Sequence, residues 1–218
     1  SLPLIMAASV GEALILNKSF RGHGLFRTVC YTPVIPSWVA AAGVWQWVPS
    51  GKYGLLNQML AAVGIQGPAW LNTPSTALYG LILMGVWGIG NTIIIYLSGL
   101  QGVGEELYEA SSIDGANSFQ RFFKITLPMI SPTIFFNVVM AVISSFQYFT
   151  QAFVMTEGGP LNSTLFYNLY LYTKAYKELK MGYAAALAWI MFIIILFFTL
   201  LVIKSSSFWV YYQNDDQI

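Results

Sequence analysis

Charged side chains are scarce in this sequence of 218 residues. Asp, Glu, Lys and Arg together make up 9% of it, against about 25% in a typical soluble domain. No charged residue occurs in four long stretches, at residues 28–51, 53–104, 125–156 and 181–203. An uncharged apolar run of about 18 residues is long enough to span a bilayer. A soluble core of this size could not bury so many such runs, so we predict an all-α, polytopic helical membrane protein.

The residue types that most catalytic and metal sites need are also missing. Cys30 is the only cysteine, so no internal disulfide is possible and metal-site spacing is absent. A net charge of +1 without a basic arm gives no case for nucleic acid. No paired carboxylates and no Ser/His/Asp or Cys/His set falls on a membrane face. We therefore expect no catalytic residue, no metal and no cofactor in this chain.

Five apolar segments predict five membrane crossings. They lie at residues 2–16, 28–47, 75–97, 128–149 and 183–203. The first segment opens directly at the start of the sequence, without a basic region or an initiator Met. We therefore expect the sequence to begin inside a longer protein, with one or more N-terminal helices missing.

The basic residues divide unequally between the two sides that five crossings create. One side takes residues 17–27, residues 98–127 and the tail from Lys204 onward, with six Lys or Arg. The other side takes residues 48–74 and 150–182, with four. Because loops rich in Lys and Arg stay in the cytoplasm, we predict that the first side is cytoplasmic.

The connection at residues 98–127 is the most charged part of the chain. Glu105 and Glu106 are placed to begin a short helix, since acidic residues suit the positive end of the helix dipole. Asp114-Gly115 is a turn signal, and Ser118 is expected to cap a second short helix. A helix pair with an apolar face needs a partner. That partner is either its own membrane bundle or another protein.

A known motif fits this connection. Glu109-Ala110-Ser111, then Gly115, then Ile125-Thr126-Leu127-Pro128 is similar to the EAA motif of ABC importer permeases: Glu-Ala-Ala, three residues, Gly, nine residues, Ile, any residue, Leu-Pro. Both spacings agree, and Ser111 keeps a small residue where the second Ala is usual. Residues 20–28, 54–60, 155–164 and 209–212 also resemble the carbohydrate-uptake, maltose-permease-like branch, so the resemblance covers essentially the whole chain.

The resemblance implies a type-I ABC importer transmembrane domain (MetI-like) over residues 1–218. Within it, residues 105–124 would form the coupling helix that sits in a groove of a cytoplasmic ATPase. Glu109 would lie near the ATPase surface, Ala110 and Ser111 would allow close approach, and Gly115 would make the turn. The other residues implied in this coupling are Asp114, Ile125, Leu127 and Pro128.

The partners that the resemblance implies are a second permease, an ABC ATPase dimer that binds ATP and Mg, and an extracytoplasmic solute-binding protein. The chain itself has no Gly-x-x-x-x-Gly-Lys-Ser/Thr loop, so it is not the ATPase. It would contact membrane lipid as a multi-pass protein of the bacterial cytoplasmic membrane. The transported solute would be a sugar, an oligosaccharide or a related polyol.

Polar residues within the spanning segments are candidates for the solute path. Hydroxyl groups of a sugar need hydrogen bonds and its apolar faces stack on aromatic rings; the alternative role is hydrogen bonding between helices. In the maltose-type permeases that the chain resembles, the corresponding helices line the transport cavity. The candidates are Trp87, Asn91, Ser144, Ser145, Gln147 and Tyr148.

Two other protein classes are possible. A membrane-embedded enzyme would need ionisable or nucleophilic groups on facing helices, and only Ser, Tyr and Asn side chains are available at depth. A self-contained secondary transporter would not need a loop that docks an ATPase. An ATPase that co-purifies with the chain would distinguish a permease from both.

Overall fold

A computed structural model describes residues 2–18, 22–51 and 53–211, and all regular elements in these ranges are helical. This confirms the all-α prediction. The elements, in chain order, are α1 (Leu2–Leu16), α2 (His23–Tyr31), η1 (Thr32–Val34), α3 (Trp38–Trp47), α4 (Leu55–Ala62), α5 (Ala77–Trp87), α6 (Gly90–Gln101), α7 (Glu105–Ile113), α8 (Ser118–Arg121), η2 (Phe122–Thr126), α9 (Leu127–Met129), α10 (Ser131–Phe146), α11 (Thr150–Met155), α12 (Tyr167–Tyr172), η3 (Thr173–Lys177) and α13 (Met181–Ser206).

The helices that could span a membrane differ in how continuous they are. Within the described residues, α13 is the one helix of sufficient length and apolarity to cross a bilayer unaided, with 26 residues. Two bent pairs reach that length together: α5 with α6, at 43°, and Ser118–Met129 with α10, at 64°. Helix α1 is a shorter apolar helix whose bounds, Leu2–Leu16, match the first predicted segment.

The second predicted crossing, residues 28–47, is wrong as a single helix. Helix α2 ends at Tyr31, a short helical turn follows, and α3 begins only at Trp38. Pro33 and Pro36 lie in the break, and proline has no backbone N–H to continue a helical ladder. The side chain of Ser37 then caps α3 by accepting a hydrogen bond from the backbone N–H of Ala40 at 3.3 Å.

Two apolar clusters hold the bundle together. One joins α1, α6 and the start of α10, and Tyr96 is fully buried in it. The other joins α3, α5 and α11, where Ala41, Ala42 and Ala152 are buried. Small residues allow helices to approach closely in a membrane, which explains how α3 and α11 pack on each other.

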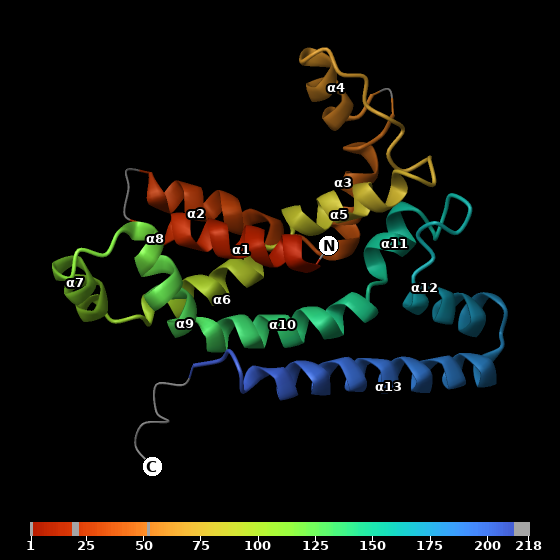
Figure 1. Cartoon of the computed structure of the whole chain (residues 1–218). Coiled ribbons are helices and arrows are strands. Elements are labelled where there is room, and N and C mark those ends of the chain that lie inside the picture. The colour runs from red at the N-terminus through yellow and green to blue at the C-terminus, as the bar shows by residue number, and fades with distance from the viewer. Residues whose placement is uncertain (1, 19–21, 52, 212–218) are drawn as a thin grey trace.

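The helices place the connections in two groups. Figure 1 shows α7 and α8 at one end of the bundle and α11 and α12 at the other, with the end of α13 returning toward α7. Helices α10 and α13 pack side by side along the bundle. This arrangement agrees with the predicted grouping of residues 98–127 with the C-terminal tail, opposite residues 150–182.

Candidate functional site

Residues 105–124, which the resemblance predicts to be a coupling loop and which we call the docking loop, form a helical hairpin. Helix α7 has Glu105 and Glu106 in its first turn, as predicted. Gly115 adopts a φ of +76°, a conformation that residues with a Cβ rarely take. This positive φ turns the chain back from α7 toward α8, which is the role that the motif assigns to the glycine.

The predicted cap of the second short helix is wrong by one residue. Helix α8 is capped by Asn117, whose side-chain oxygen accepts from the backbone N–H of Gln120 at 2.8 Å. The Gln120 side chain accepts in return from the backbone N–H of Asn117 at 2.9 Å. This reciprocal capping box needs an amide or carboxylate three residues after the cap. Gln120 stands at that distance from Asn117, which is why Asn117 rather than Ser118 is the cap.

The motif residues on α7 face two ways. Glu109, Ala110, Asp114 and Gly115 are exposed. Ser111 is 8% exposed, and its hydroxyl donates to the backbone oxygen of Tyr108 at 2.8 Å. Small size at Ser111 therefore serves packing inside the loop, while Glu109 and Ala110 lie on its outer surface.

Large apolar side chains complete the outer surface of the docking loop. Ile113 is 88% exposed and Phe119 is 71% exposed. The ring of Phe119 lies against that of Phe123, with centroids 4.6 Å apart and the planes tilted by 48°. Sequence reasoning missed Ile113, although its position four residues after Glu109 places it on the same helix face.

The hairpin leads into the next spanning helix through a bend. Residues Phe122–Thr126 form one π-helical turn, and Leu127–Met129 form a short α-helix that contains Pro128 near its start. Ile125 packs against the buried cluster around Tyr96 and Leu100. The 64° bend between Ser118–Met129 and α10 follows; we call this bend, at Ile130, the elbow.

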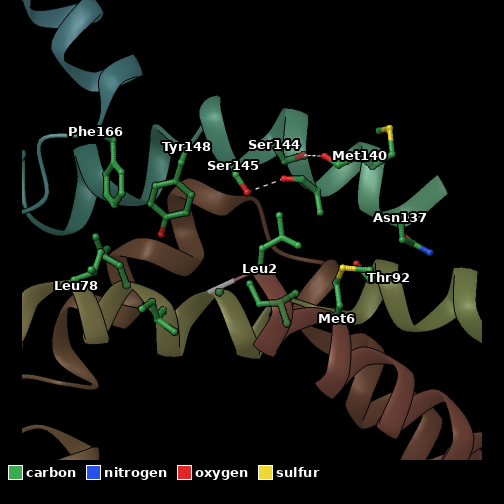
Figure 2. A pocket seen from close by; sticks show the side chains of 15 residues that line it. Leu2, Met6, Leu78, Thr92, Asn137, Met140, Ser144, Ser145, Tyr148 and Phe166 are labelled. Atoms are coloured by element: carbon green, nitrogen blue, oxygen red, sulfur yellow. Dashed lines mark hydrogen bonds between the residues drawn. The ribbon is translucent and has the colours of Figure 1, made fainter. Parts of the chain in front are cut away.

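A cavity of about 370 Å³ lies among α1, α5, α6 and α10. Figure 2 shows its lining side chains converging from these helices. Three of the predicted path residues line it, namely Ser144, Ser145 and Tyr148. Sequence reasoning missed Asn137 and Thr92, which also line it. Asn137 lies seven residues before Ser144, which places both on one face of α10 and could have identified it.

The other three predicted path residues lie outside the cavity lining. Trp87 packs against Trp45, with ring centroids 5.8 Å apart. Asn91 is exposed, while its neighbour Thr92 lines the cavity. The backbone oxygen of Gln147 accepts from the side chain of Asn168 at 3.2 Å. Thr92 lies seven residues after Gly85 and continues the stripe of α5 that lines the cavity, whereas Asn91 continues the face of Trp87, four residues before it.

The cavity lining contains serine acceptors and a tyrosine whose hydroxyl is buried in the wall. The hydroxyl of Ser144 donates to the backbone oxygen of Met140 at 2.8 Å, and that of Ser145 donates to Ala141 at 2.7 Å (Figure 2). These bonds use the serine protons and leave their lone pairs available. The hydroxyl of Tyr148 is buried and has no hydrogen-bond partner among the described residues. Its ring meets that of Phe166 edge-on, at 4.9 Å.

Known proteins resemble the chain over almost its whole length. The family model described as "Binding-protein-dependent transport system inner membrane component" matches residues 2–214. The Bacillus subtilis protein named "Probable ABC transporter permease protein YesP" is 44% identical over 220 residues, 99% of this chain and 71% of that protein. The "Trehalose/maltose transport system permease protein MalF" of Thermococcus litoralis is 32% identical over 196 residues, 89% of this chain and 65% of that protein.

A solved structure has the same fold. It is titled "Crystal structure of bacterial alginate ABC transporter in complex with alginate pentasaccharide-bound periplasmic protein". The likeness has a TM-score of 0.86 at 24% identity and covers 94% of this chain and 73% of that one. These matches confirm the resemblance drawn from the motif. This chain belongs to the family of binding-protein-dependent transport system inner membrane components.

Proposed function

We propose that this chain is a permease subunit that forms, with a second permease, the membrane path of an ATP-driven importer. The observation that carries the proposal is that one helix, α10, connects the two functional parts. It begins at the elbow behind the docking loop, and its side chains Asn137, Met140, Ser144 and Ser145 line the cavity. Movement of the loop would therefore reach the cavity through a single element.

The docking loop has the surface of a protein-binding site. Ile113 and Phe119 expose large apolar side chains at the end of the bundle, and exposed apolar patches of this kind mark interaction sites. Glu109 and Asp114 add exposed negative charge beside them. An ATPase with a groove that is apolar at its base and basic at its rim would complement this surface. ATP and Mg would bind to that ATPase.

The cavity has the chemistry of a carbohydrate path. Serine lone pairs and the Tyr148 hydroxyl supply acceptors and a donor, and the rings of Tyr148 and Phe166 supply apolar surface. Two relatives carry the names of trehalose/maltose and lactose permeases. We infer that the solute is a sugar, an oligosaccharide or a related polyol. A second permease would line the remaining side of the path.

The proposed orientation places the docking loop in the cytoplasm. The opposite end, with α11 and α12, would then face an extracytoplasmic solute-binding protein. The larger number of Lys and Arg on the loop side supports this orientation. The chain would be a multi-pass component of the bacterial cytoplasmic membrane.

Co-purification of the ATPase tests the proposal. We expect an affinity-tagged form of the chain, expressed with its transport operon, to retain the ATPase subunits, and Glu109→Lys to weaken that retention. Glu157→Lys is the matched charge reversal at the opposite end, where the Glu157 side chain is 72% exposed, and should retain them. Equal ATPase retention in both variants would contradict the coupling role of the loop.

The same preparation identifies the solute and tests the rival classes. Mass spectrometry of material bound to the co-encoded solute-binding protein should find a carbohydrate. Solute uptake that continues when the ATPase subunits are deleted would favour a secondary transporter instead.

A further inference from the structure

Among the described residues, few side-chain hydrogen bonds join α7 to the rest of the chain, and one of them reaches a buried residue four positions before the elbow. The hydroxyl of Tyr108 lies 2.9 Å from the hydroxyl of Thr126, 18 residues further along the chain. Thr126 is 5% exposed and is the last residue of the π-helical turn. It is followed by Leu127 and Pro128, which lead into the elbow. The pair therefore connects the outer helix of the docking loop to the base of α10.

The Thr126 side chain also makes a second, longer contact. The Thr126 hydroxyl donates to the backbone oxygen of Arg121 at 3.4 Å. Either hydroxyl can be the donor in the shorter contact between Tyr108 and Thr126. The ring of Tyr108 is partly buried against the cluster that contains Leu100 and Ile130. Removal of the tyrosine oxygen alone would break the bond and leave the ring in place.

A second contact ties the two arms of the hairpin together. The guanidinium Nη1 of Arg121 donates to the Ser112 hydroxyl at 3.1 Å, and Ser112 donates to the backbone oxygen of Tyr108 at 2.7 Å. Both bonds lie within the hairpin, before the π-helical turn. They make the docking loop move as one body, whereas Tyr108–Thr126 joins that body to the elbow. π-Helical turns of a single turn occur frequently at functional sites.

We propose that Tyr108 and Thr126 are positioning residues that transmit the movement of the docking loop to α10 and so to the cavity. The proposal rests on the proposed function, because it assumes that an ATPase moves the loop. It adds that docking and transmission are separable: the exposed face with Glu109 and Ile113 binds the ATPase, and the buried hydroxyl pair passes the displacement on. Loss of the pair should leave the ATPase bound, and the cavity should change less when ATP is added.

Chemically matched substitutions separate the bond from the packing. Tyr108→Phe removes one hydroxyl and keeps the ring, and Thr126→Val removes the other hydroxyl at nearly constant shape. Thr126→Ser keeps the hydroxyl and removes a methyl group. A double variant with Tyr108→Phe and Thr126→Val tests whether the two residues act through each other, because coupled residues give non-additive effects.

The experiment uses the complete transporter in liposomes, with the second permease, the ATPase subunits and the co-encoded solute-binding protein. The reporter is Ala141→Cys, which lies in the cavity lining on α10, in a Cys30→Ser background that removes the only native cysteine of this chain. The probe is a membrane-impermeant thiol reagent. Its labelling rate is measured with and without ATP and Mg²⁺, and ATPase retention is measured on the same preparations.

We expect ATP to change the labelling rate of the parent reporter. Tyr108→Phe and Thr126→Val should each reduce that change by about fivefold, the effect of one net hydrogen bond on an equilibrium. In the double variant, the ATP-dependent change in labelling rate should be no smaller than in either single variant. In Thr126→Ser, that change should equal the change in the parent. ATPase retention should be unchanged in all four.

Other outcomes overturn the inference. A full ATP response in Tyr108→Phe and Thr126→Val would show that the pair transmits nothing. An equal loss in Thr126→Ser would assign the effect to packing, and loss of the ATPase in Tyr108→Phe would assign the pair to docking. If the parent transporter itself retains no ATPase, the proposed function fails, and this outcome is distinct from a failure of the hydroxyl pair alone.

Discussion

The hydroxyl of Ser131 accepts a hydrogen bond from the backbone N–H of Tyr211 at 2.8 Å, across 80 residues of sequence. The same hydroxyl donates to the backbone oxygen of Pro128 at 2.6 Å, and Ser131 is 3% exposed. Nearby, the ring of Trp209 meets that of Phe135 edge-on, at 6.2 Å. One side chain therefore holds the elbow in shape and fastens the segment after α13 against it.

Ser131→Ala should release this segment. A buried neutral hydrogen bond contributes about 1 kcal/mol, so the amide of Tyr211 should exchange hydrogen about fivefold faster. Hydrogen–deuterium exchange of the purified protein measures this rate. Ser207→Ala is the control, because its exposed hydroxyl donates only to the backbone oxygen of Lys204, at 3.2 Å. Unchanged exchange at Tyr211 would mean that the segment is held by its aromatic packing instead.

The features that the sequence predicts well are those that depend on nearby residues. Helix α1 follows from one apolar run bounded by polar residues, and the hairpin of the docking loop follows from Asp114-Gly115 between two short amphipathic stretches. The family resemblance gave the same loop independently, because the EAA motif is a local pattern. Fold class and family were therefore accessible before any coordinates were known.

The features that were missed depend on three-dimensional contacts. A Cβ at Gly88 would overlap the ring of Trp38, and one at Gly90 would lie 2.6 Å from the Val34 side chain. These close approaches lie where α5 gives way to α6, and periodicity alone does not reveal them. The hydroxyl pair between Tyr108 and Thr126 likewise appears only when the loop is folded.

The orientation of the chain is open to direct labelling. In a Cys30→Ser background, we expect Leu161→Cys to react with an impermeant thiol reagent added to intact cells, and Ser118→Cys to react only after the cells are opened. Both positions are exposed in the structure, Leu161 by 88%. Each variant is labelled both in intact cells and in opened cells, so that entry of the reagent through damaged cells can be recognised. Labelling of Ser118→Cys from outside would reverse the proposed orientation.

Tyr148 should contribute to solute affinity. Its hydroxyl is buried in the cavity wall without a partner among the described residues, so a solute hydroxyl that reaches it and accepts from it would gain about 1 kcal/mol. Tyr148→Phe should then raise the half-saturating concentration for uptake about fivefold, and Tyr148→Ala should raise it further because the ring is lost. Gln147→Ala, outside the cavity lining, should transport normally. Unchanged affinity in Tyr148→Ala would assign Tyr148 to helix packing.

The corner between η3 and α13 should loosen in acid. Glu178 accepts from Lys174 at 2.5 Å and from Lys180 at 2.8 Å. These bonds lower the pKa of the Glu178 carboxyl from 4.5, and the bond with Glu178 raises the pKa of Lys174 from 10.5. Because the carboxyl pKa is lowered in the folded protein, Glu178 stabilises the fold at pH values above its unfolded pKa, and this stabilisation is lost as the pH falls through the folded pKa. Because the lysine pKa is raised, Lys174 stabilises the fold at pH values below its unfolded pKa, and this stabilisation is lost as the pH rises through the folded pKa.

Limited proteolysis at this corner measures the effect. The cleavage rate after Lys177 and Lys180 should stay constant through the neutral range and rise as the pH falls through and below 4.5, the ordinary value for Glu178. An acid-tolerant protease with a peptide standard at each pH corrects for the enzyme's own pH dependence. The Glu178→Gln variant should be cleaved faster at neutral pH, and its cleavage rate should no longer rise in acid. An acid response that persists in Glu178→Gln would place its origin elsewhere.

Gly115→Val should loosen the ATPase while the chain stays in the membrane. Gly115 has a φ of +76° and no atom within 4 Å of an added Cβ, so the substitution meets backbone strain and no clash. Such strain costs about 1 kcal/mol or more, and relief of it would tilt α7, with Glu109 and Ile113, away from the ATPase. Gly104→Ser is the matched control at the other end of α7, because φ is −59° there and the space is equally open. ATPase co-purification and uptake should fall together in Gly115→Val and stay near normal in Gly104→Ser. Full ATPase binding and transport in Gly115→Val would remove the bend at Gly115 from the coupling mechanism.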